Sequence, residues 1–572
     1  MDSKGMVWDR FEYIYIVVRN DGEKVLNFST DTITDPITVE VVRNKLDGIA
    51  NEMQSTLFRS SFSPIVKEGL DASASLFTVA GETLAQAIAL PFHLATLIPM
   101  VGKILEDFLL ENMNDGDIYI MNDPYMGGTH LPDIALIMPI FYDGEPIAFS
   151  AAMTHHQDVG GMSPGSVPTN ATEIFQEGVR IPPLKYWDAG RKNETLVKIL
   201  RLNVRLPDSF EGDLNAQVAA CETGRRRLSE LAARYGIREV REIFSDLLQR
   251  SEIMMRKAIR DLPNGTYSHH DYLDNDGIDL ETPIRIEVAV AIQDDQIQVD
   301  FTGSDDQVKG PFNLMPSGAY AAAYFAVNAM TDPDIPTNGG CFRPVRLHLP
   351  KKSIVNPEEP AAVNARTSTM KRVAGCITSA LGKAVPDRAV ADAAGELLLL
   401  AFGGNRINGS RYVVGELIAS GSGASHGMDG VDVIETDGTN CMNLPVEAFE
   451  LDVPIRINKT ELRLGSGGAG KYRGGLGITR EYEVLAGEVV FTHRGERYVY
   501  PAQGINGGKA GAKARSIICR TDGSQQFIKS KTVERLMTGD RVLVETAGGG
   551  GYGNPDERAE ELILADKANR KT

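Results

Sequence analysis

Two apolar segments joined by a short polar turn place the strongest constraint on how this chain folds. Ile134–Phe141 and Ile147–Met153 are almost entirely apolar, and Asp143-Gly144 between them is a favoured hairpin turn. Short continuous apolar runs bounded by turn residues are typical of buried strands. The segment therefore predicts an apolar β-hairpin.

Histidine and aspartate residues gather at one end of this hairpin. His130 and Asp133 precede the first strand, and His155 and His156 follow the second. A two-residue loop would place Asp133 opposite Thr154, whereas a three-residue loop would place it opposite His155. Directly opposed residues have Cβ atoms about 4.5–5.5 Å apart. Either register therefore lets these side chains reach one cation.

Imidazole and carboxylate ligands suit Zn, Mn or Fe(II), and the lack of thiolate ligands argues against a purely structural zinc site. A single loop histidine usually makes only hydrogen bonds, but several potential ligands at one hairpin end favour a divalent metal. Asp71 could join them, although taken alone it is typical of a turn carboxylate. His93 lies in an apolar stretch, where it is either a hydrogen-bonded core residue or a general acid or base.

Helix and strand patterns follow one another irregularly, without the regular β-α-β alternation of a parallel sheet, which favours the α+β class. Helical spacing predicts helices from Pro36, in a pair over 210–261 and over Ser317–Met330. The changes in pattern divide the chain into an N-terminal extension (1–35), an α+β region with the candidate metal site (36–210), a helical segment (211–265), an α+β region with a buried helix (266–400) and a glycine-rich, mainly β region (401–572).

The composition argues against several classes of partner and compartment. Lys and Arg number 59 against 77 Asp and Glu, a net charge of −18, which argues against nucleic acid or an anionic membrane surface. The five cysteines are dispersed and contain no C-x-x-C pair, and the N-terminus lacks a signal-peptide pattern. Thr83–Gly102 has no charged side chain, but its prolines and polar residues predict a buried core segment rather than a membrane span. We expect a cytoplasmic protein.

Three glycine-containing segments match known motifs without the surroundings that those motifs need. Gly465–Lys471 resembles a phosphate-binding loop, but Tyr472 stands where Ser or Thr would hold Mg²⁺. Gly548–Gly553 is followed by too little chain for a dinucleotide-binding unit. Ser425 lies in a nucleophile-like Gly423–Gly427 segment that no helix pattern follows. We expect no ATP site on this chain, and a serine hydrolase acting through Ser425 is the least favoured alternative.

Several segments together resemble the hydantoinase B/oxoprolinase family. The resemblance rests on Asp35–Leu46, Asn122–Asp133, His155–Gly161, Ile335–Pro344 and Thr546–Pro555. It implies a divalent metal, either Zn, Mn or Fe, held by Asp71, His130, Asp133 and His155, with the adjacent His156 as the alternative to His155. His93, or whichever of His155 and His156 is not a ligand, would then be the catalytic residue that moves a proton.

The same resemblance implies a partner chain and a reaction. A hydantoinase A-type subunit would bind ATP and Mg and phosphorylate the oxygen of a small cyclic amide, forming a heterotetramer or larger complex with this chain. This chain would then complete the hydrolysis with its metal. Two alternatives stay open: the metal subunit of an ATP-dependent ketone carboxylase, and a metal-stabilised scaffold for an active partner.

Overall fold

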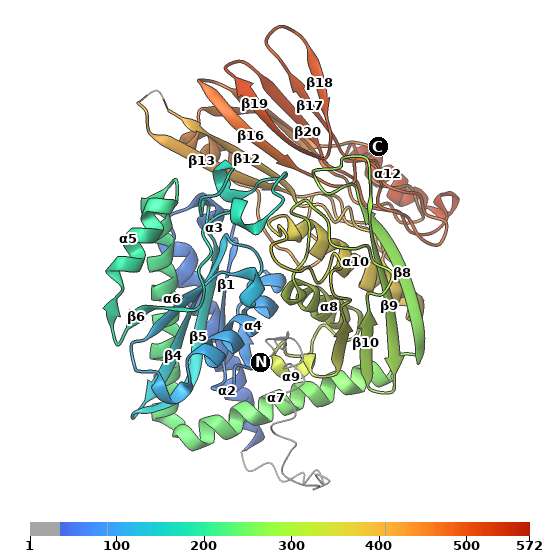
Figure 1. Cartoon of the computed structure of the whole chain (residues 1–572). Coiled ribbons are helices and arrows are strands. Elements are labelled where there is room, and N and C mark those ends of the chain that lie inside the picture. The colour runs from blue at the N-terminus through green and yellow to red at the C-terminus, as the bar shows by residue number, and fades with distance from the viewer. Residues whose placement is uncertain (1–34, 89, 407, 572) are drawn as a thin grey trace.

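The predicted hairpin forms the centre of a seven-stranded antiparallel sheet with the order β2-β1-β5-β4-β3-β6-β7 (Figure 1). The structure, a computed structural model, describes residues 35–571 apart from residues 89 and 407, so the predicted extension 1–35 lies almost wholly outside the described residues. The strands of this sheet are β1 (Ala72–Phe77), β2 (Thr83–Gln86), β3 (Ile118–Met121), β4 (Asp133–Tyr142), β5 (Glu145–His155), β6 (Leu184–Asp188) and β7 (Arg191–Lys192).

The register of the hairpin combines the two predicted alternatives. Asp143 and Gly144 have φ angles of 49° and 78° and form a two-residue turn, which pairs Tyr142 with Glu145. A bulge between Ile140 and Phe141 then shifts the pairing by one residue. Because of this bulge, Asp133 lies opposite His155 at the far end of the hairpin, as the longer loop would have placed it.

Helices cover both faces of this sheet, and the strand pleat sends neighbouring residues to opposite faces. Ala152 packs in the core beneath α2 and α6, whereas the next residue, Met153, packs in the core beneath α4. The same alternation places His155 on the α4 face and His156 on the α6 face. The covering helices are α2 (Pro36–Ser60), α4 (Pro91–Asp107) and α6 (Pro207–Tyr235).

A second sheet with its own helices lies beside the first sheet. The helix α7 joins the two parts and runs along the base of both (Figure 1). The second sheet has the order β11-β10-β9-β8, and α8 and α10 pack against each other over it. The elements are α7 (Ile237–Arg260), β8 (Gly265–Leu273), β9 (Ile284–Gln293), β10 (Gln296–Asp300), α8 (Pro316–Met330), α9 (Gly339–Phe342), β11 (Val345–His348) and α10 (Arg366–Ala384).

The C-terminal region adds two further antiparallel sheets that share one apolar core. Their orders are β13-β12-β16-β19 and β14-β15-β20-β17-β18. The strands are β12 (Leu398–Asn405), β13 (Arg411–Ile418), β14 (Ile455–Leu462), β15 (Ile478–Val484), β16 (Glu488–Arg494), β17 (Arg515–Cys519), β18 (Gln525–Ile528), β19 (Lys531–Met537) and β20 (Arg541–Glu545). Further α-helices among the described residues are α3 (Pro64–Lys67), α5 (Glu194–Asn203), α11 (Val446–Asp452) and α12 (Glu560–Ala568).

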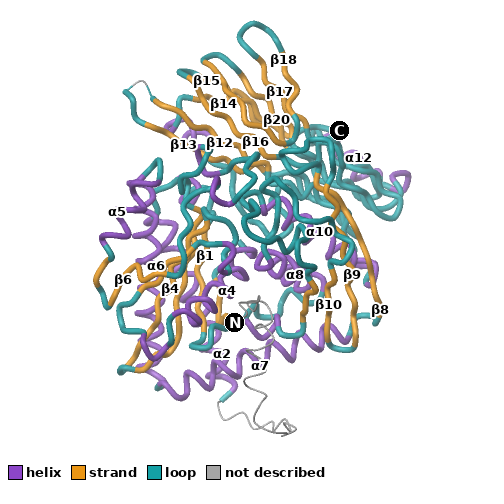
Figure 2. The backbone as a smooth tube through the Cα atoms, viewed as in Figure 1, coloured by secondary structure: helices purple, strands orange, loops and turns teal. Residues whose placement is uncertain are grey.

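Backbone segments rich in glycine pack directly on one another beside these sheets, where Figure 2 shows a dense group of loops. The Gly468 N–H donates to the Gly549 carbonyl at 2.8 Å, and the Gly549 N–H donates to the Gly475 carbonyl at 3.0 Å. A Cβ atom on Gly549 would lie 1.8 Å from the Ser422 carbonyl oxygen, so only glycine allows this approach. The segments that resemble nucleotide-binding loops therefore pair with each other through their backbones.

The α+β class is confirmed. The helix from Pro36, the helical pair and the buried helix over 316–330 are present, and Thr83–Gly102 divides into β2 and the first part of α4. The helix α10 had no clear sequence signal, because Lys371 and Arg372 interrupt its apolar pattern although both are buried. Within the described residues, every helix is too short or too polar to span a membrane.

Candidate metal centre

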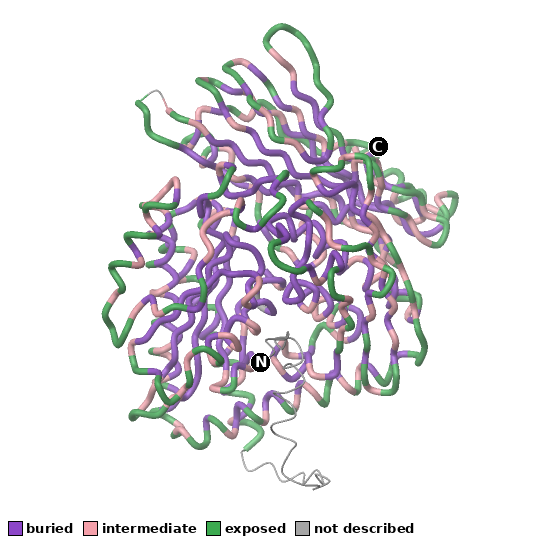
Figure 3. Tube along the Cα trace, viewed as in Figure 1, coloured by how far each residue is buried: buried purple, intermediate pink, exposed green. Residues whose placement is uncertain are grey.

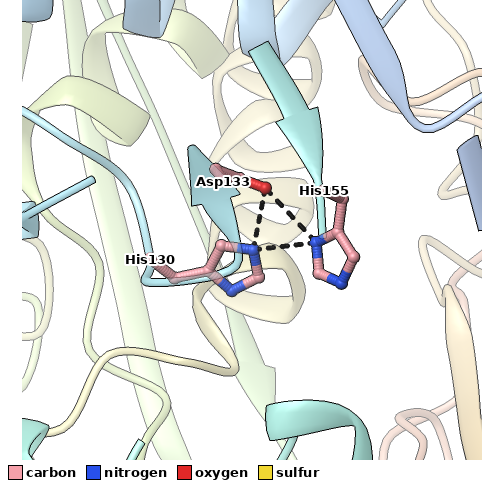
Figure 4. Close-up of side chains that lie close together, drawn as sticks. All are labelled: His130, Asp133 and His155. Carbon is pink, nitrogen blue, oxygen red and sulfur yellow. Dashed lines mark hydrogen bonds and ion pairs between the residues drawn. The ribbon is translucent and has the colours of Figure 1, made fainter. Parts of the chain in front are cut away.

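Three side chains converge at the end of the central hairpin (Figure 4). The Asp133 Oδ1 atom lies 3.0 Å from His130 Nε2 and 3.3 Å from His155 Nδ1, and the two histidine nitrogens lie 3.2 Å apart. All three residues are buried, and Figure 3 shows that the strands of the central hairpin are buried along most of their length. These are the hairpin residues for which the sequence predicted a shared cation.

The backbone of the hairpin and of β1 sets this arrangement. The Asp133 N–H donates to the His130 carbonyl at 3.1 Å, which closes a turn that returns His130 towards the strand. The His155 N–H donates to the Asp71 carbonyl at 3.1 Å, so the start of β1 lies directly beside the end of β5. The loop before β4, the end of β5 and the start of β1 thus meet at one end of these three neighbouring strands.

The hydrogen bond on the far side of His130 determines which of its nitrogens carries a proton. His130 Nδ1 lies 2.9 Å from the Asn364 carbonyl oxygen, which can only accept, so Nδ1 is protonated and Nε2 presents a lone pair. Burial, aided by the charge of Arg366, lowers the pKa of His130 to about 3, so the ring does not carry a second proton at neutral pH. The lone pair of Nε2 therefore faces a carboxylate oxygen at 3.0 Å, a repulsive pairing that a cation would relieve.

Asp71 and His93 stand at the margin of this cluster. His93 Nε2 lies 3.5 Å from Asp71 Oδ1 and 3.8 Å from Asp133 Oδ2, and His93 Nδ1 has no hydrogen-bond partner among the described residues. Burial lowers the pKa of His93, which favours its neutral form. The helix α4 begins at Pro91, so its first turn is the element that brings His93 to the cluster.

His156 does not reach the cluster. It points to the α6 face of the sheet, where its Nε2 lies 3.2 Å from Gln217 Oε1 and its ring lies 4.7 Å from the ring of Phe210. The Gln217 amide nitrogen donates to backbone carbonyls of β4 and β5. Gln217 Oε1 must therefore accept, so His156 carries a proton on Nε2, and burial lowers the pKa of His156, which favours its neutral form. Of the predicted site residues, only His156 lies away from the others.

Two side chains that hold Asp133 had no signal in the sequence. Arg366, the first residue of α10, forms an ion pair with Asp133 Oδ2 from 233 residues along the chain, and the Thr129 hydroxyl donates to the same oxygen. Burial opposes the ionisation of Asp133, but its pKa is held well below the usual range, and with His130 neutral the favourable charge is that of Arg366. Asp133 is therefore an ionised carboxylate. Its outer oxygen, Oδ2, already binds Arg366 and Thr129, and its inner oxygen, Oδ1, faces the histidines.

Asn364 and Glu177 support His130 from behind. The Asn364 N–H donates to Glu177 Oε1 at 2.8 Å, and the Asn364 side-chain amide donates to the Ser166 carbonyl at 2.6 Å. The carbonyl that fixes His130 is therefore itself fixed on both sides. Glu177 is fully buried, and this burial raises its pKa to about 8, so the carboxyl group is largely protonated at neutral pH.

Replacing Glu177 by glutamine should reduce the pH dependence of stability. Because the folded-state pKa of Glu177 is raised to about 8, whereas a glutamate in the unfolded chain has a pKa of about 4.3, the wild-type chain loses stability as the pH rises between these two values, by up to about 1.4 kcal/mol per pH unit for one proton, and loses no more above about pH 8. Glutamine keeps the acceptor and carries no proton to lose. Urea unfolding should show the free energy of unfolding of the wild type falling relative to that of the variant between pH 5 and pH 8, and a constant difference above pH 8; a constant difference over the whole range would contradict a protonated Glu177.

Comparison with known proteins places these residues in a family. The sequence profile of the hydantoinase B/oxoprolinase family matches residues 35–555. The chain belongs to this family. It is 38% identical to an uncharacterized protein of Methanocaldococcus jannaschii, over 94% of each chain. It is 31% identical to the 5-oxoprolinase of Dictyostelium discoideum over 92% of this chain, which corresponds to 41% of that longer protein.

A solved structure supports the same family, and a second one shares the fold. This hydantoinase B family chain is similar to an ATP-dependent caprolactamase from Pseudomonas jessenii, with a TM-score of 0.89 and 32% identity over 94% of each chain. In sequence it is 34% identical to the caprolactamase subunit beta of that organism, over 94% of each chain. Its fold is also that of a nucleotide-free acetone carboxylase chain, with a TM-score of 0.89 at 20% identity, over 99% of this chain and 82% of that one.

Proposed function

We propose that this chain is the metal-bearing B-type subunit of an ATP-dependent cyclic amidase. The observation that carries the proposal is the unprotonated His130 Nε2, which faces the Asp133 carboxylate at 3.0 Å beside His155. His130, Asp133 and His155 would hold the metal, and Asp71 at the margin of the cluster would complete its ligands. Nitrogen and oxygen ligands of this kind suit Zn, Mn or Fe. A bound divalent metal supplies Lewis acidity, which lowers the pKa of water to about 7.

The residues around this centre have separate tasks in the proposed reaction. Arg366 and Thr129 hold the outer oxygen of Asp133, so the inner oxygen stays in place without an entropic cost at the moment of reaction. His93, neutral because it is buried, accepts a proton at Nε2, and the carboxylate of Asp71 at 3.5 Å stabilises the charge that develops there. His156 takes no part, since it faces α6.

The activation of the amide is assigned to a partner. Resonance makes a lactam carbonyl a poor electrophile, and phosphorylation of its oxygen by ATP would make that carbon open to water. The glycine-rich segments of this chain that resemble phosphate loops are occupied by their own backbone contacts. A hydantoinase A-type subunit would therefore bind ATP and Mg in a heterotetramer or larger complex in the cytoplasm. The names of the caprolactamase relative, a beta subunit, and of the longer 5-oxoprolinase support this division.

Reconstitution with an A-type subunit tests the function. The complex should open hydantoin, caprolactam or 5-oxoproline only with ATP, release phosphate with the ring-opened acid, and lose this activity on treatment with a chelator. The isolated chain should show no turnover. Incorporation of labelled bicarbonate into a ketone would favour the carboxylase alternative instead. Full amidase activity after complete metal removal would favour the scaffold.

A further inference from the structure

The residues of the proposed metal centre are buried, so a substrate needs part of the chain to move before it can reach them. His130, Asp133 and His155 are 1%, 0% and 7% exposed. His93 and Asp71, at the margin of the cluster, are 6% and 8% exposed. Loops that open and close over buried sites are common in enzymes. A segment that covers this margin would therefore control access to the centre.

An irregular segment of the connection between β13 and α11, residues 435–442, lies against this margin and is here called the strap. Its Gly438 carbonyl accepts the Phe92 N–H at 3.3 Å, and Phe92 is the neighbour of His93. A Cβ atom on Gly438 would lie 2.2 Å from the Phe92 ring. The strap therefore packs directly on the first turn of α4, which carries His93.

The other end of the strap lies beside Asp71. The Met442 N–H donates to the Gly69 carbonyl at 3.1 Å, two residues before Asp71. Asn440 and Met442 are exposed, whereas Cys441 between them is 8% exposed. Burial, and after it the charge of Asp71, raises the pKa of the Cys441 thiol. The strap therefore has solvent on one side, and on its other side the thiol lies near a residue of the centre.

One buried lysine of α10 holds the strap. Lys371 Nζ donates to the Thr436 carbonyl at 2.5 Å and to the Thr439 hydroxyl at 2.6 Å. It also forms an ion pair with Glu435 Oε2 at 3.1 Å. All three acceptors belong to the strap, and Lys371 is 1% exposed. Because Arg366 lies in the same helix, α10 holds both the strap and the proposed metal ligand that Arg366 contacts.

We propose that the strap is a movable cover of the metal centre and that Lys371 is the latch that keeps it closed. When the three contacts of Lys371 break, the strap lifts from α4, and a path opens between His93 and Asp71. The kind of molecule that enters by this path rests on the proposed function. The strap and its latch rest on the contacts that join 435–442 to α4, to α10 and to the chain before Asp71.

Chemical labelling of the full-length chain, read at each residue by mass spectrometry, tests the proposal. Lys371→Met combined with Glu435→Gln removes the ion pair without leaving an unpaired buried charge. In this latch variant N-ethylmaleimide should label Cys441 at least 10-fold faster than in the wild type. Diethyl pyrocarbonate, which acylates neutral imidazole, should label His93 and His155 at least 10-fold faster.

Two buried residues show whether the variant loosens the chain as a whole. Cys376 lies in α10 and His156 on the α6 face of the central sheet, and both should keep their wild-type rates. Lys383→Met changes an exposed lysine of the same helix, and this matched control should label as the wild type does. Thr439→Val removes one acceptor of the latch and leaves its charges in place, so labelling should accelerate at the same residues by a smaller factor.

Three results would overturn the proposal. Wild-type labelling of Cys441 in the folded latch variant, or in Thr439→Val if the latch variant does not fold, would show that Lys371 does not hold the strap. Faster labelling of Cys441 without the two histidines would show that the strap does not cover the centre. Equal acceleration at Cys376 would show that general loosening, and not the release of a latch, is the cause.

The outcome separates from that of the proposed function, because the labelling needs neither a bound metal nor turnover. Faster labelling of the centre in a chain whose complex opens no cyclic amide would support the strap while the proposed function fails. Amidase activity of the complex with unchanged labelling in the latch variant would do the reverse.

Discussion

Replacing Asp133 by asparagine should release the metal and lower the ATP-dependent turnover of the complex by about 10²–10³-fold or more, the loss typical of removing one group that stabilises charge in an active site. Asp133 is the residue whose inner oxygen contacts both histidines, at 3.0 and 3.3 Å. Asparagine keeps the size but not the charge. Elemental analysis of the purified variant and phosphate release with a cyclic amide would measure both effects.

The Asp133 variant also affects Arg366, so a second variant is needed. Without its carboxylate partner Arg366 is left as a buried unpaired cation, which costs about 3–5 kcal/mol in comparable pairs. His130→Ala removes a proposed ligand without unpairing Arg366 and should give the same loss of metal. His348→Ala, at an exposed histidine of β11, is the matched control. Stoichiometric metal and full turnover in both site variants would contradict the assignment.

The sequence predicted the hairpin and most of the site because those features are local. The apolar runs and the Asp143-Gly144 turn give the two strands, and His130, Asp133 and His155 lie within one hairpin. The open choice between His155 and His156 was a question of register. A bulge near Phe141 sets that register, and it has no clear sequence signal, but once the register is known the strand pleat places His155 with Asp133 and His156 on the other face.

The support of the site could not be predicted, because it comes from distant parts of the chain. Arg366, Asn364 and Glu177 contact the hairpin or one another across long sequence separations. In a sequence, a buried arginine or glutamate is indistinguishable from one on a solvated surface. Burial and pairing decide their role, and both depend on the packing of α10 beside the central sheet. The buried charged residues of α10 are also the reason that the apolar pattern did not predict this helix.

Replacing His93 by glutamine should separate proton transfer from metal binding. The His93 Nε2 atom lies 3.5 Å from Asp71 and 3.8 Å from Asp133, outside the 3.0–3.3 Å contacts of the three central side chains. We therefore expect the variant to keep the metal at the wild-type ratio and to lose about 10²–10⁴-fold in turnover, the usual contribution of a general acid or base. Elemental analysis and kcat on the same preparation give both quantities.

The turnover of His93→Gln must be compared with that of His156→Gln, because both histidines were candidates for the residue that moves a proton. His156→Gln alters a histidine that contacts Gln217 and Phe210 on the α6 face, so its effect should appear in the free energy of unfolding. Its turnover per folded molecule should fall far less than that of His93→Gln. Metal loss in His93→Gln would instead make His93 a ligand, and an equal loss of turnover in the two variants would mean that neither acts as the proton carrier. The two variants thus test whether the reaction takes place on the α4 face of the sheet, where His93 lies, or on the α6 face, where His156 lies.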